Sequence, residues 1–397
     1  MSAATPGAST SRTSPPIPRA GRPTLRPTLR PTLGPTLRVV PRNALAGLAE
    51  DWAGLYARSS AATPFQSYSW LCSWWRAYGT PGRLRVFLAY RGGRLVAAAP
   101  LRLEYRLGCR VLTPVGGGQS DFTDIMVDDA EGEAGLRELR AGLLAQPGWD
   151  VIDLPEARPG AAILRLAGLW GGRAWTLPAS TCLQLPGRPI EQVMAGLNSR
   201  RARRLRTAMR KLDAMDLSVD VVEPDRVEHS VRELLRLHVL QWESRGINVQ
   251  HTEPRFMDHL TRATRSLVVE DRAVLKEFRV RGRLRACDLT VVGKDFVGGY
   301  LYGADPELRA EADVLTMLLR DNLETAHRLA KPVLSLLRGD EPHKAKFGCE
   351  AVVNQRVMLG RGVRSAAYAA SAGTRAAGRE LLKRRCPRLV ERFAAWR

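Results

Sequence analysis

The sequence predicts an α/β (α+β) fold with two domains in tandem, each a mixed, largely antiparallel sheet flanked by helices. Its 397 residues exceed what one ordinary core holds, and 45% of them are hydrophobic, enough for two cores. The second half reads helix, helix, antiparallel strands, long helix, strand, unlike the alternation of a doubly wound sheet. No GxGxxG or GxxxxGK[ST] motif occurs, which disfavours dinucleotide-binding and P-loop folds.

Four segments are expected along the chain. Residues 1–38 form a basic leader with four tandem PTLx units, and we expect disorder because repeated proline removes backbone donors. Residues 39–185 and 186–362 are the two predicted domains, and residues 363–397 are a basic helical tail.

In the first domain, helices are expected over 43–58 and 69–78; in the latter, Trp70, Trp74 and Tyr78 recur every four residues on one face. Apolar runs bounded by turn residues predict the elements that follow. They are strands 84–90, 95–103, 110–115 and 125–127, helix 131–145, strand 151–154, helix 159–169 and strand 173–177.

In the second domain, a basic helix over 189–212 comes first. The same signals then predict strand 217–222, helices 224–245 and 253–265, strands 267–269, 273–280, 284–292 and 296–302, helix 311–329, strand 333–337 and a strand near 352–359. A polar loop over 338–348 separates the last two strands.

The net charge of +21 is concentrated in three places: residues 1–38, 198–212 and 361–397. The rest of the chain is balanced, whereas a folded nucleic-acid module more often carries a basic stripe with interleaved aromatic residues. Nucleic acid is therefore an unlikely partner. The block over 198–212 has two open interpretations, a solvated helix face or a phosphate-binding surface.

Composition also bears on metals and location. The six cysteines form no CxxC pair and the six histidines no HExxH motif, so neither a metal site nor a disulfide framework is expected. No apolar run of about 18 residues could span a membrane, and the first residues show no secretory signal. A cytoplasmic location is the expectation.

Several motifs in order resemble the CelD-type acyltransferases, a branch of the GNAT superfamily related to the Fem-type aminoacyltransferases of cell-wall synthesis. They extend over residues 44–361 and read PFQSYSWLCSWW, GGRLVAAAPL, SDFTDIMV, RARRLRTAMRKL, GRLRACDLTV, GGYLYGADPELR and GDEPHKAKFG. The resemblance implies two tandem GNAT-like domains, with acetyl-CoA or another acyl-CoA as co-substrate in the second, no metal, and a small-molecule or saccharide acceptor.

For the donor site, the resemblance indicates the start of the long helix, where unpaired amides and the helix dipole favour a pyrophosphate. The predicted donor-binding residues are Tyr300, Tyr302, Ala312, Asp313, Val314 and Leu315. The family usually has a Ser-Pro-Gly-like turn here. This chain has Ala310-Glu311-Ala312-Asp313, whose two carboxylates repel phosphate.

The polar loop over 338–348 is the predicted place of chemistry. Asp340 or Glu341 is a candidate general base, and His343 could share that role because its ordinary pKa is near 6.5. Lys344 is expected to hold an anionic group, as the matching lysine of Fem-type relatives does. Asp288, a carboxylate between apolar strand residues, either faces the site or bonds a neighbouring element.

Three functions stay open at this point. The first is an acyl-CoA-dependent N- or O-acyltransferase. The second is a Fem-type ligase that takes an aminoacyl group from tRNA. The third is a GNAT-fold binding protein that has lost donor affinity, which the missing glycine near Ala312 favours. Asp121 and Asp124, after the glycine-rich turn, either line a cleft or are turn residues without chemistry.

Overall fold

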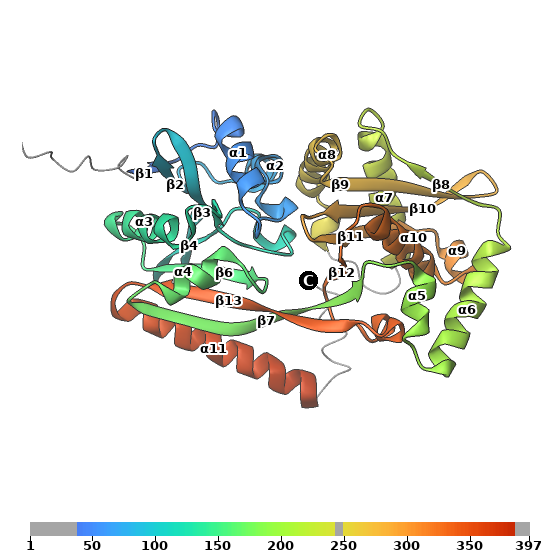
Figure 1. Ribbon diagram of the computed structural model, residues 1–397. Coiled ribbons are helices and arrows are strands. Elements are labelled where there is room, and N and C mark those ends of the chain that lie inside the picture. The colour runs from blue at the N-terminus through green and yellow to red at the C-terminus, as the bar shows by residue number, and fades with distance from the viewer. Residues whose placement is uncertain (1–37, 243–248, 386–397) are drawn as a thin grey trace, which may run out of the picture. The chain divides into compact units, whose positions relative to one another are not determined.

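The computed structural model describes residues 38–242 and 249–385, so the predicted disorder of the leader falls almost wholly outside the described residues. The strands form one sheet in the order β1-β2-β3-β4-β6-β13-β7-β12-β11-β10-β9-β8, with β5 paired to β3 (Figure 1). Most neighbouring strands are antiparallel, and β4–β6 and β11–β12 are the parallel pairs. The predicted α/β class, a mixed and largely antiparallel arrangement of strands flanked by helices, is confirmed, although the strands of both predicted domains join in one sheet.

The N-terminal half, residues 38–186, contains the first seven strands. They are β1 (Arg38–Arg42), β2 (Leu84–Arg91), β3 (Arg94–Arg106), β4 (Cys109–Pro114), β5 (Met126–Val127), β6 (Val151–Ala157) and β7 (Arg173–Pro186). Its helices are α1 (Ala49–Arg58), α2 (Tyr68–Tyr78), α3 (Gly132–Ala145) and α4 (Ala162–Gly168), with 3-10 turns η1 (Pro64–Gln66) and η2 (Gly117–Gln119).

The C-terminal half, residues 187–385, repeats this plan. Its strands are β8 (Leu217–Val221), β9 (Ala273–Val280), β10 (Arg283–Val292), β11 (Phe296–Ala304), β12 (Val333–Arg338) and β13 (Glu350–Gly360). Its helices are α5 (Ile190–Ala195), α6 (Ser199–Asp213), α7 (Val227–Trp242), α8 (Pro254–Val269), α9 (Pro306–Glu311), α10 (Val314–Arg328) and α11 (Gly362–Arg385), with 3-10 turns η3 (Val249–Thr252) and η4 (Pro342–Phe347).

The last strand of each half crosses into the other half. β7 and β13 pair along their length, from Arg173 with Gly360 to Gln184 with Glu350 (Figure 1). The carboxyl end of β7 then pairs with β12, and the carboxyl end of β13 pairs with β6. Each half of the sheet is therefore completed by a strand that belongs to the other half.

One apolar core also joins the halves. It includes Trp52 and Trp70 from the N-terminal half together with Leu234, Phe256 and Leu289 from the C-terminal half. α2 packs directly on α8 in this core. Burial of such side chains at about 25 cal/mol per Å² makes the shared core a major stabilising contact between the halves.

Sequence predictions of secondary structure are wrong near residues 189–212 and 267–269. The helix over 189–212 is two helices, α5 and α6, because Gly196 ends the first and Asn198 caps the second by accepting from the Arg201 amide at 3.0 Å. The strand at 267–269 is the last turn of α8, whose buried face continues to Leu267. A short apolar run does not distinguish the end of a helix from a strand.

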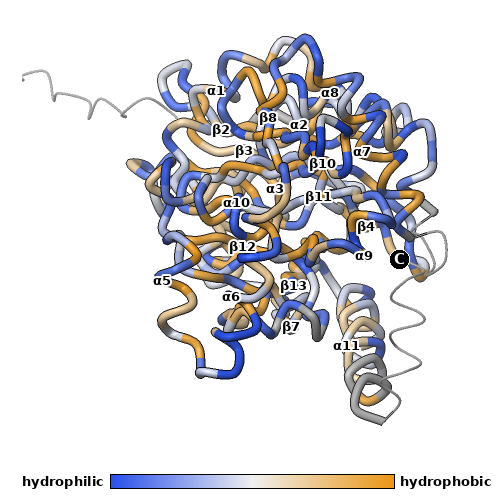
Figure 2. Tube along the Cα trace, turned by 90° about the vertical axis from the view of Figure 1, so that its right-hand side faces the viewer, coloured by the Kyte–Doolittle hydropathy of each residue, from blue (hydrophilic) through white to orange (hydrophobic). Residues whose placement is uncertain are grey.

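Helix α6 shows how the basic block folds. Ala202, Leu205, Met209 and Leu212 are buried at helical spacing, and the basic side chains of the helix are exposed. The α5–α6 region accordingly shows hydrophobic and hydrophilic segments along its tube in Figure 2. The interpretation of this block as a solvated helix face agrees with the structure.

Candidate functional site

The candidate site lies where two parallel strands of the C-terminal half separate. β11 and β12 pair over three residues only, from Phe296 with Val333 to Gly298 with Ser335. Past these pairs each strand continues for several residues without pairing to the other. In open α/β sheets, ligands bind outside the carboxyl ends of parallel strands at such a point.

Helix α7 covers part of this opening. Its His238 Nδ1 lies 2.8 Å from the carbonyl oxygen of Tyr302, and its Gln241 Oε1 accepts from the Ala304 amide at 3.1 Å. Near the end of β11, where β12 is no longer paired to it, two backbone groups therefore form hydrogen bonds with side chains of α7. These backbone groups keep hydrogen-bond partners although the strand pairing has ended.

The segments that follow the two strands meet. Asp313 caps α10 by accepting from the Thr316 amide at 3.2 Å, and its other carboxylate oxygen forms an ion pair with Lys346 of η4. Burial raises the pKa of Asp313, but Lys346 and the Thr316 amide outweigh that effect and hold the pKa below its usual range. The structure therefore brings the predicted donor residues and the predicted catalytic loop together.

The carboxylates before α10 are both neutralised. Glu311 Oε1 lies 3.4 Å from Arg285 Nη2, and Asp313 is paired with Lys346. The helix predicted over 311–329 is interrupted here, because α9 ends at Glu311 and Ala312 is extended, with φ −141° and ψ 158°. The expected repulsion of a phosphate by these two acids is correspondingly reduced.

The neighbouring predicted donor residues have packing roles. Ala312 and Val314 are buried in the core with Leu318, and Leu315 is partly buried against the core on the α5–α6 side. The groups that these residues could offer a ligand are therefore their backbone amides, because the first amides of a helix have no acceptor inside the helix.

The polar loop after β12 is organised by one ion pair. Lys344 Nζ, in η4, lies 2.6 Å from Oε2 of Glu341, the residue that precedes η4, and Asp340 is exposed. His343 lies in the same turn, and its side chain is outside what the structure describes. Lys346 of this loop therefore lies at the start of α10, while the catalytic assignment of Asp340, Glu341, His343 and Lys344 stays a prediction.

Asp288 lies in a buried polar cluster between β10 and α10. Its Oδ2 accepts from Asn322 Nδ2 at 2.8 Å and from Thr290 Oγ1 at 3.1 Å. Burial raises its pKa to about 6, although Asn322 and the nearby Lys276 favour the charged form. Of the two interpretations left open by the sequence, the structure shows the bond to a neighbouring element.

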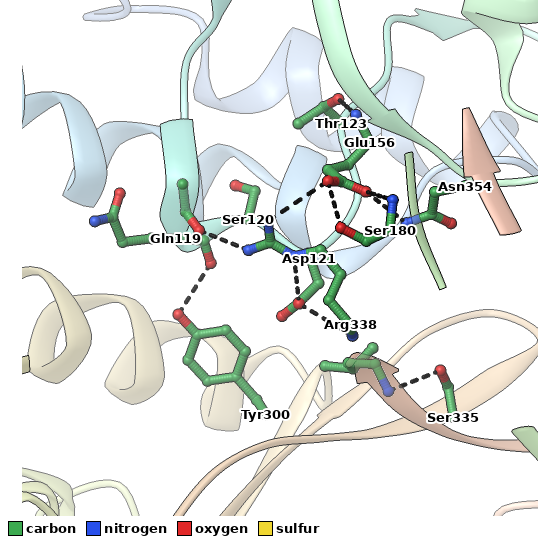
Figure 3. Close-up of polar contacts among 12 residues, drawn as sticks. Gln119, Ser120, Asp121, Thr123, Glu156, Ser180, Tyr300, Ser335, Arg338 and Asn354 are labelled. Atoms are coloured by element: carbon green, nitrogen blue, oxygen red, sulfur yellow. Dashed lines mark hydrogen bonds and ion pairs between the residues drawn. The ribbon is translucent and has the colours of Figure 1, made fainter. Parts of the chain in front are cut away.

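Tyr300 and Tyr302 take different environments. The Tyr300 hydroxyl donates to the carbonyl of Gln119 at 3.0 Å, and burial raises its pKa well above the usual value (Figure 3). The Tyr302 hydroxyl accepts from Arg309 Nη2 at 3.1 Å. Tyr300 thus links the opening to the N-terminal half, and Tyr302 packs in the core under α9.

Arg338 is the main polar link between the halves at this point, and the sequence analysis gave it no role. Its Nε donates to Asp121 at 2.8 Å and its Nη2 to the Gly118 carbonyl at 2.7 Å, while Glu156 lies 3.8 Å away (Figure 3). Burial lowers the pKa of Arg338, but Asp121 and Glu156 raise it overall. The partners are about 200 residues distant in sequence, so no local signal could have revealed them.

Of the two aspartates after the glycine-rich turn, Asp124 is structural. It accepts from the amides of Ala162 and Ile163 at the start of α4, at 2.7 and 2.8 Å. Burial raises its pKa to about 7 against the effect of these bonds. Asp121, by contrast, faces Arg338.

A pair of histidines, of which His238 is buried and His251 half-buried, also lies beside the opening. His251 Nδ1 is 3.1 Å from His238 Nε2, and the His251 ring stacks on Phe256. Burial, with a smaller effect from His238, lowers the pKa of His251 to about 4, so the ring is neutral at pH 7. The sequence analysis named only His343 as a possible base and missed this pair.

Metal-binding clusters and membrane-spanning helices were also sought among the described residues. Among residues 38–242 and 249–385, no group of three or more His, Cys, Asp or Glu is placed to hold a metal ion. None of the described helices combines the length and the apolar character that a membrane span requires.

Comparison with known proteins agrees with this geometry. Residues 199–345 match the family model described as an acetyltransferase (GNAT) domain. A search of curated proteins by sequence gave no match. The chain thus carries a GNAT-type acetyltransferase domain in its C-terminal half, around the opening between β11 and β12.

Solved structures resemble the chain over most of its length. FemX superposes with a TM-score of 0.55 at 9% identity, over 78% of this chain and 95% of that chain. The C-terminal domain of a putative lysylphosphatidylglycerol synthetase from Agrobacterium fabrum superposes with a TM-score of 0.51 at 12% sequence identity, over 83% of this chain and 96% of that chain. L-PGS from Bacillus licheniformis superposes with a TM-score of 0.52 at 10% sequence identity, over 83% of this chain and 96% of that chain. At such identities the likeness concerns the fold alone.

Fold and family match together define the class of the protein: it is a GNAT-fold, acyltransferase-like protein. The narrower resemblance to CelD-type acyltransferases stays a prediction.

Proposed function

We propose that the chain is a cytoplasmic acyltransferase that moves an acyl group, most simply acetyl, from acyl-CoA to an amine or hydroxyl of a sugar, polysaccharide precursor or small metabolite. The observation that carries this proposal is the ion pair between Lys346 and Asp313. It brings Lys346 of the polar loop to the start of α10, where Asp313 caps the helix, beside the separating strands. Helix N-termini and lysines are both suited to a pyrophosphate.

In this proposal the donor's phosphates bind the amides at the start of α10, with Lys346 and Lys344 as counter-charges. The acceptor's nitrogen or oxygen attacks the thioester carbonyl, its proton goes to a base, and CoA leaves as the thiol. Asp340, Glu341 and His343 remain the candidate bases from the loop. His251 is a further candidate in this proposal, because its lowered pKa leaves one ring nitrogen without a proton at pH 7.

Asp288 receives a positioning role in this scheme. Its bond to Asn322 ties β10 to the middle of α10, so it fixes the helix whose N-terminus holds the donor. A residue of this kind acts through the helix and does not touch the reacting atoms.

A second candidate function has its own observation. Helix α6 exposes seven basic side chains, and no carboxylate among the described residues pairs with them. A Fem-type ligase that uses aminoacyl-tRNA would have use for such a surface, because phosphate contacts dominate nucleic-acid affinity. The placement of Lys346 at α10 favours the acyl-CoA reading.

The test compares donors on the full-length protein. Thermal shift with acetyl-CoA, a longer acyl-CoA and an aminoacyl-tRNA should reveal stabilisation by an acyl-CoA, about 2.7 kcal/mol at a hundred times its Kd. Thiol release with amine and hydroxyl acceptors then measures transfer. Stabilisation by aminoacyl-tRNA alone would favour the ligase. Failure of every donor to bind would favour a degenerate GNAT-fold binding protein.

A further inference from the structure

Strand β8 is one of the two edge strands of the sheet, at the end opposite β1 (Figure 1). It pairs with β9 on one side, from Leu217 with Val280 to Val221 with Lys276. No other strand among the described residues lies on its second side. An edge of this kind presents a row of backbone donors and acceptors to which another strand can pair.

The two edges of the sheet differ in how they resist such pairing. β1 includes Pro41, which has no amide hydrogen to donate, together with Arg38 and Arg42. Proline and basic residues are common means by which natural edge strands avoid pairing with other chains. β8, with the sequence LSVDV, contains neither. The β8 edge is therefore the one suited to a further strand.

The backbone groups of β8 that face outward can be deduced from its flanking residues. Asp216 and Val222, just outside the two ends of β8, each form a backbone hydrogen bond of 2.9 Å on the β9 side. Because residues that bond to the neighbour alternate with residues that do not, the even-numbered residues of β8 bond to β9. The N–H and C=O groups of Val219 and Val221 consequently point away from β9.

The side chains of this edge are apolar on one face. Leu217 packs in the core cluster that contains Phe278 of β9 and Leu318 of α10. Val219 and Val221 lie on the same face as Leu217, because successive side chains of a strand alternate. They are 40% and 51% exposed. An apolar face therefore runs from the core to the open edge.

We propose that β8 is a self-association surface, on which a second copy of this chain adds its own β8 as an antiparallel strand centred on Val219. Each Val219 amide donates to the Val219 carbonyl of the other copy, and each Val221 amide donates to the Leu217 carbonyl. Residues directly opposite each other share a face, so Val221 meets Leu217 on the apolar face and Asp220 meets Ser218 on the polar face. The interface does not depend on acyl-CoA binding.

The partner is a second copy because β8 complements itself in this one register. A shift by one residue sets each valine opposite a polar residue. A shift by two sets Asp220 opposite either Asp220 or Asp216 of the other copy, and like charges directly opposite are destabilising. In the central register Asp220 meets a hydroxyl and keeps its bond to Arg279, at 3.2 Å. Backbone direction, apolar face and charge are satisfied together only there.

Sedimentation velocity of the full-length protein tests the association. A contact between two short strands is at the small end of interface sizes, so we expect a weak dimer. The 43.8 kDa monomer should dominate at low micromolar concentration and the dimer should grow at high micromolar concentration. High salt is used because it screens the repulsion between copies of net charge +21. A monomer at every concentration would overturn the proposal.

Two cysteine variants test the register. In the proposed pairing the two Val219 Cα atoms are about 5.5 Å apart, a separation that a disulfide can join. The two Val221 Cα atoms are roughly 14 Å apart, because four residues of rise separate them along the strands. Mild oxidation should therefore cross-link Val219→Cys but neither Val221→Cys nor the wild type, which controls for the native cysteines. Equal or stronger cross-linking of Val221→Cys would rule out this register.

Two further variants of the central residue test the backbone contact. Val219→Pro removes the outward amide hydrogen, whereas Val219→Thr keeps the amide and the branched shape. We expect Val219→Pro to raise the dimer Kd by about tenfold or more and Val219→Thr to leave it nearly unchanged, with melting temperature as the check on folding. Should Val219→Pro not fold, Val219→Lys places like charges at the centre of the pair. An unaltered dimer in a folded proline or lysine variant would assign the association to another surface and contradict the proposal.

Discussion

Each half of the sheet contains one pair of parallel strands that separate after a few residues, but the helices around the two openings are placed differently. In the N-terminal half the parallel strands β4 and β6 pair only from Val111 with Val151 to Leu112 with Ile152. In the C-terminal half β11 and β12 pair over three residues. In each half a helix lies along the chain between the two parallel strands: α3 between β4 and β6, and α10 between β11 and β12. The two halves differ in where that helix packs.

Helix α3 does not begin directly after β4. A segment with η2 and β5 follows β4, and α3 then packs mainly on β1, β2, β3 and α4, not on β4 and β6. Glu131 at its start pairs with Arg91 at 2.9 Å. Helix α10, by contrast, packs on β11 and β12 themselves, and Lys346 lies at its first turn. Within residues 38–242 and 249–385, the two halves therefore differ in that the C-terminal opening has a helix packed on its own two strands, with the cation Lys346 at the first turn of that helix.

The largest expected effect comes from separating the halves. A fragment of residues 39–185 lacks β13, so β6 loses a partner, and the end of β7 loses β12. We predict that this fragment, alone, shows no cooperative urea transition by circular dichroism, since each half-sheet and the shared core are incomplete. Co-expression with residues 186–397 should restore a folded complex. A stable, cooperative fragment would show that the halves are independent domains and that the exchange is dispensable.

Arg338→Ala should have the next largest effect. It leaves the carboxylates of Asp121 and Glu156 without their cation in a buried place, which typically costs about 3–5 kcal/mol. Urea unfolding measures the loss. Arg320→Ala, which breaks an exposed pair with Asp213, is the control and should cost less than about 1 kcal/mol. Equal small losses would mean that the polar link between the halves contributes little.

A pH effect should come from His259, which links the halves through α2. Its Nδ1 is 3.0 Å from Ser73 Oγ, and burial lowers its pKa to about 3. The unfolded chain takes up this proton below about pH 6.5 and the folded chain does not, so stability falls as pH falls. Between pH 6.5 and 5 we expect a loss of about 1.5 kcal/mol from this group. His259→Gln should remove that part of the pH dependence; unchanged curves would contradict the assignment.

Lys344→Ala should lower acyl transfer at least tenfold, or about 1.4 kcal/mol, with little effect on stability. The reason is its place in η4, two residues before the Lys346 that reaches the start of α10, and its ion pair with Glu341. Lys211→Ala, an exposed lysine on α6, is the matched control. Initial rates with acyl-CoA at several concentrations distinguish the two variants. Equal rates would move the site away from this loop.

Local sequence patterns predicted many individual elements. The spacing of Trp70, Trp74 and Tyr78 matched α2, and the turn between the strands ending near Val280 and beginning near Leu284 matched the β9–β10 hairpin. These succeed because helix and hairpin signals lie within a few residues of each other. The false strand at 267–269 shows the limit of the same signals.

The site was predictable only in part. Asp313, Lys344 and their neighbours were named from a loop and a helix start that the resemblance indicated. The contacts of Arg338 with Asp121 and of Asn354 with Glu156 join residues about 200 positions apart. Such contacts depend on the exchange of β7 and β13, and strand order over that distance leaves no periodic trace in the sequence.

The most direct test of the central claim is calorimetric titration of the full-length protein with coenzyme A, comparing wild type, Lys346→Ala and Arg94→Ala. Arg94 pairs with Glu131 at the start of α3, the counterpart of α10 in the N-terminal half. We predict that Lys346→Ala weakens binding by about fivefold or more, the loss of about 1 kcal/mol expected for a charge at a helix N-terminus, and that Arg94→Ala leaves it unchanged. If coenzyme A binding were unchanged by Lys346→Ala but weakened by Arg94→Ala, the donor would bind in the N-terminal half, which would contradict the account.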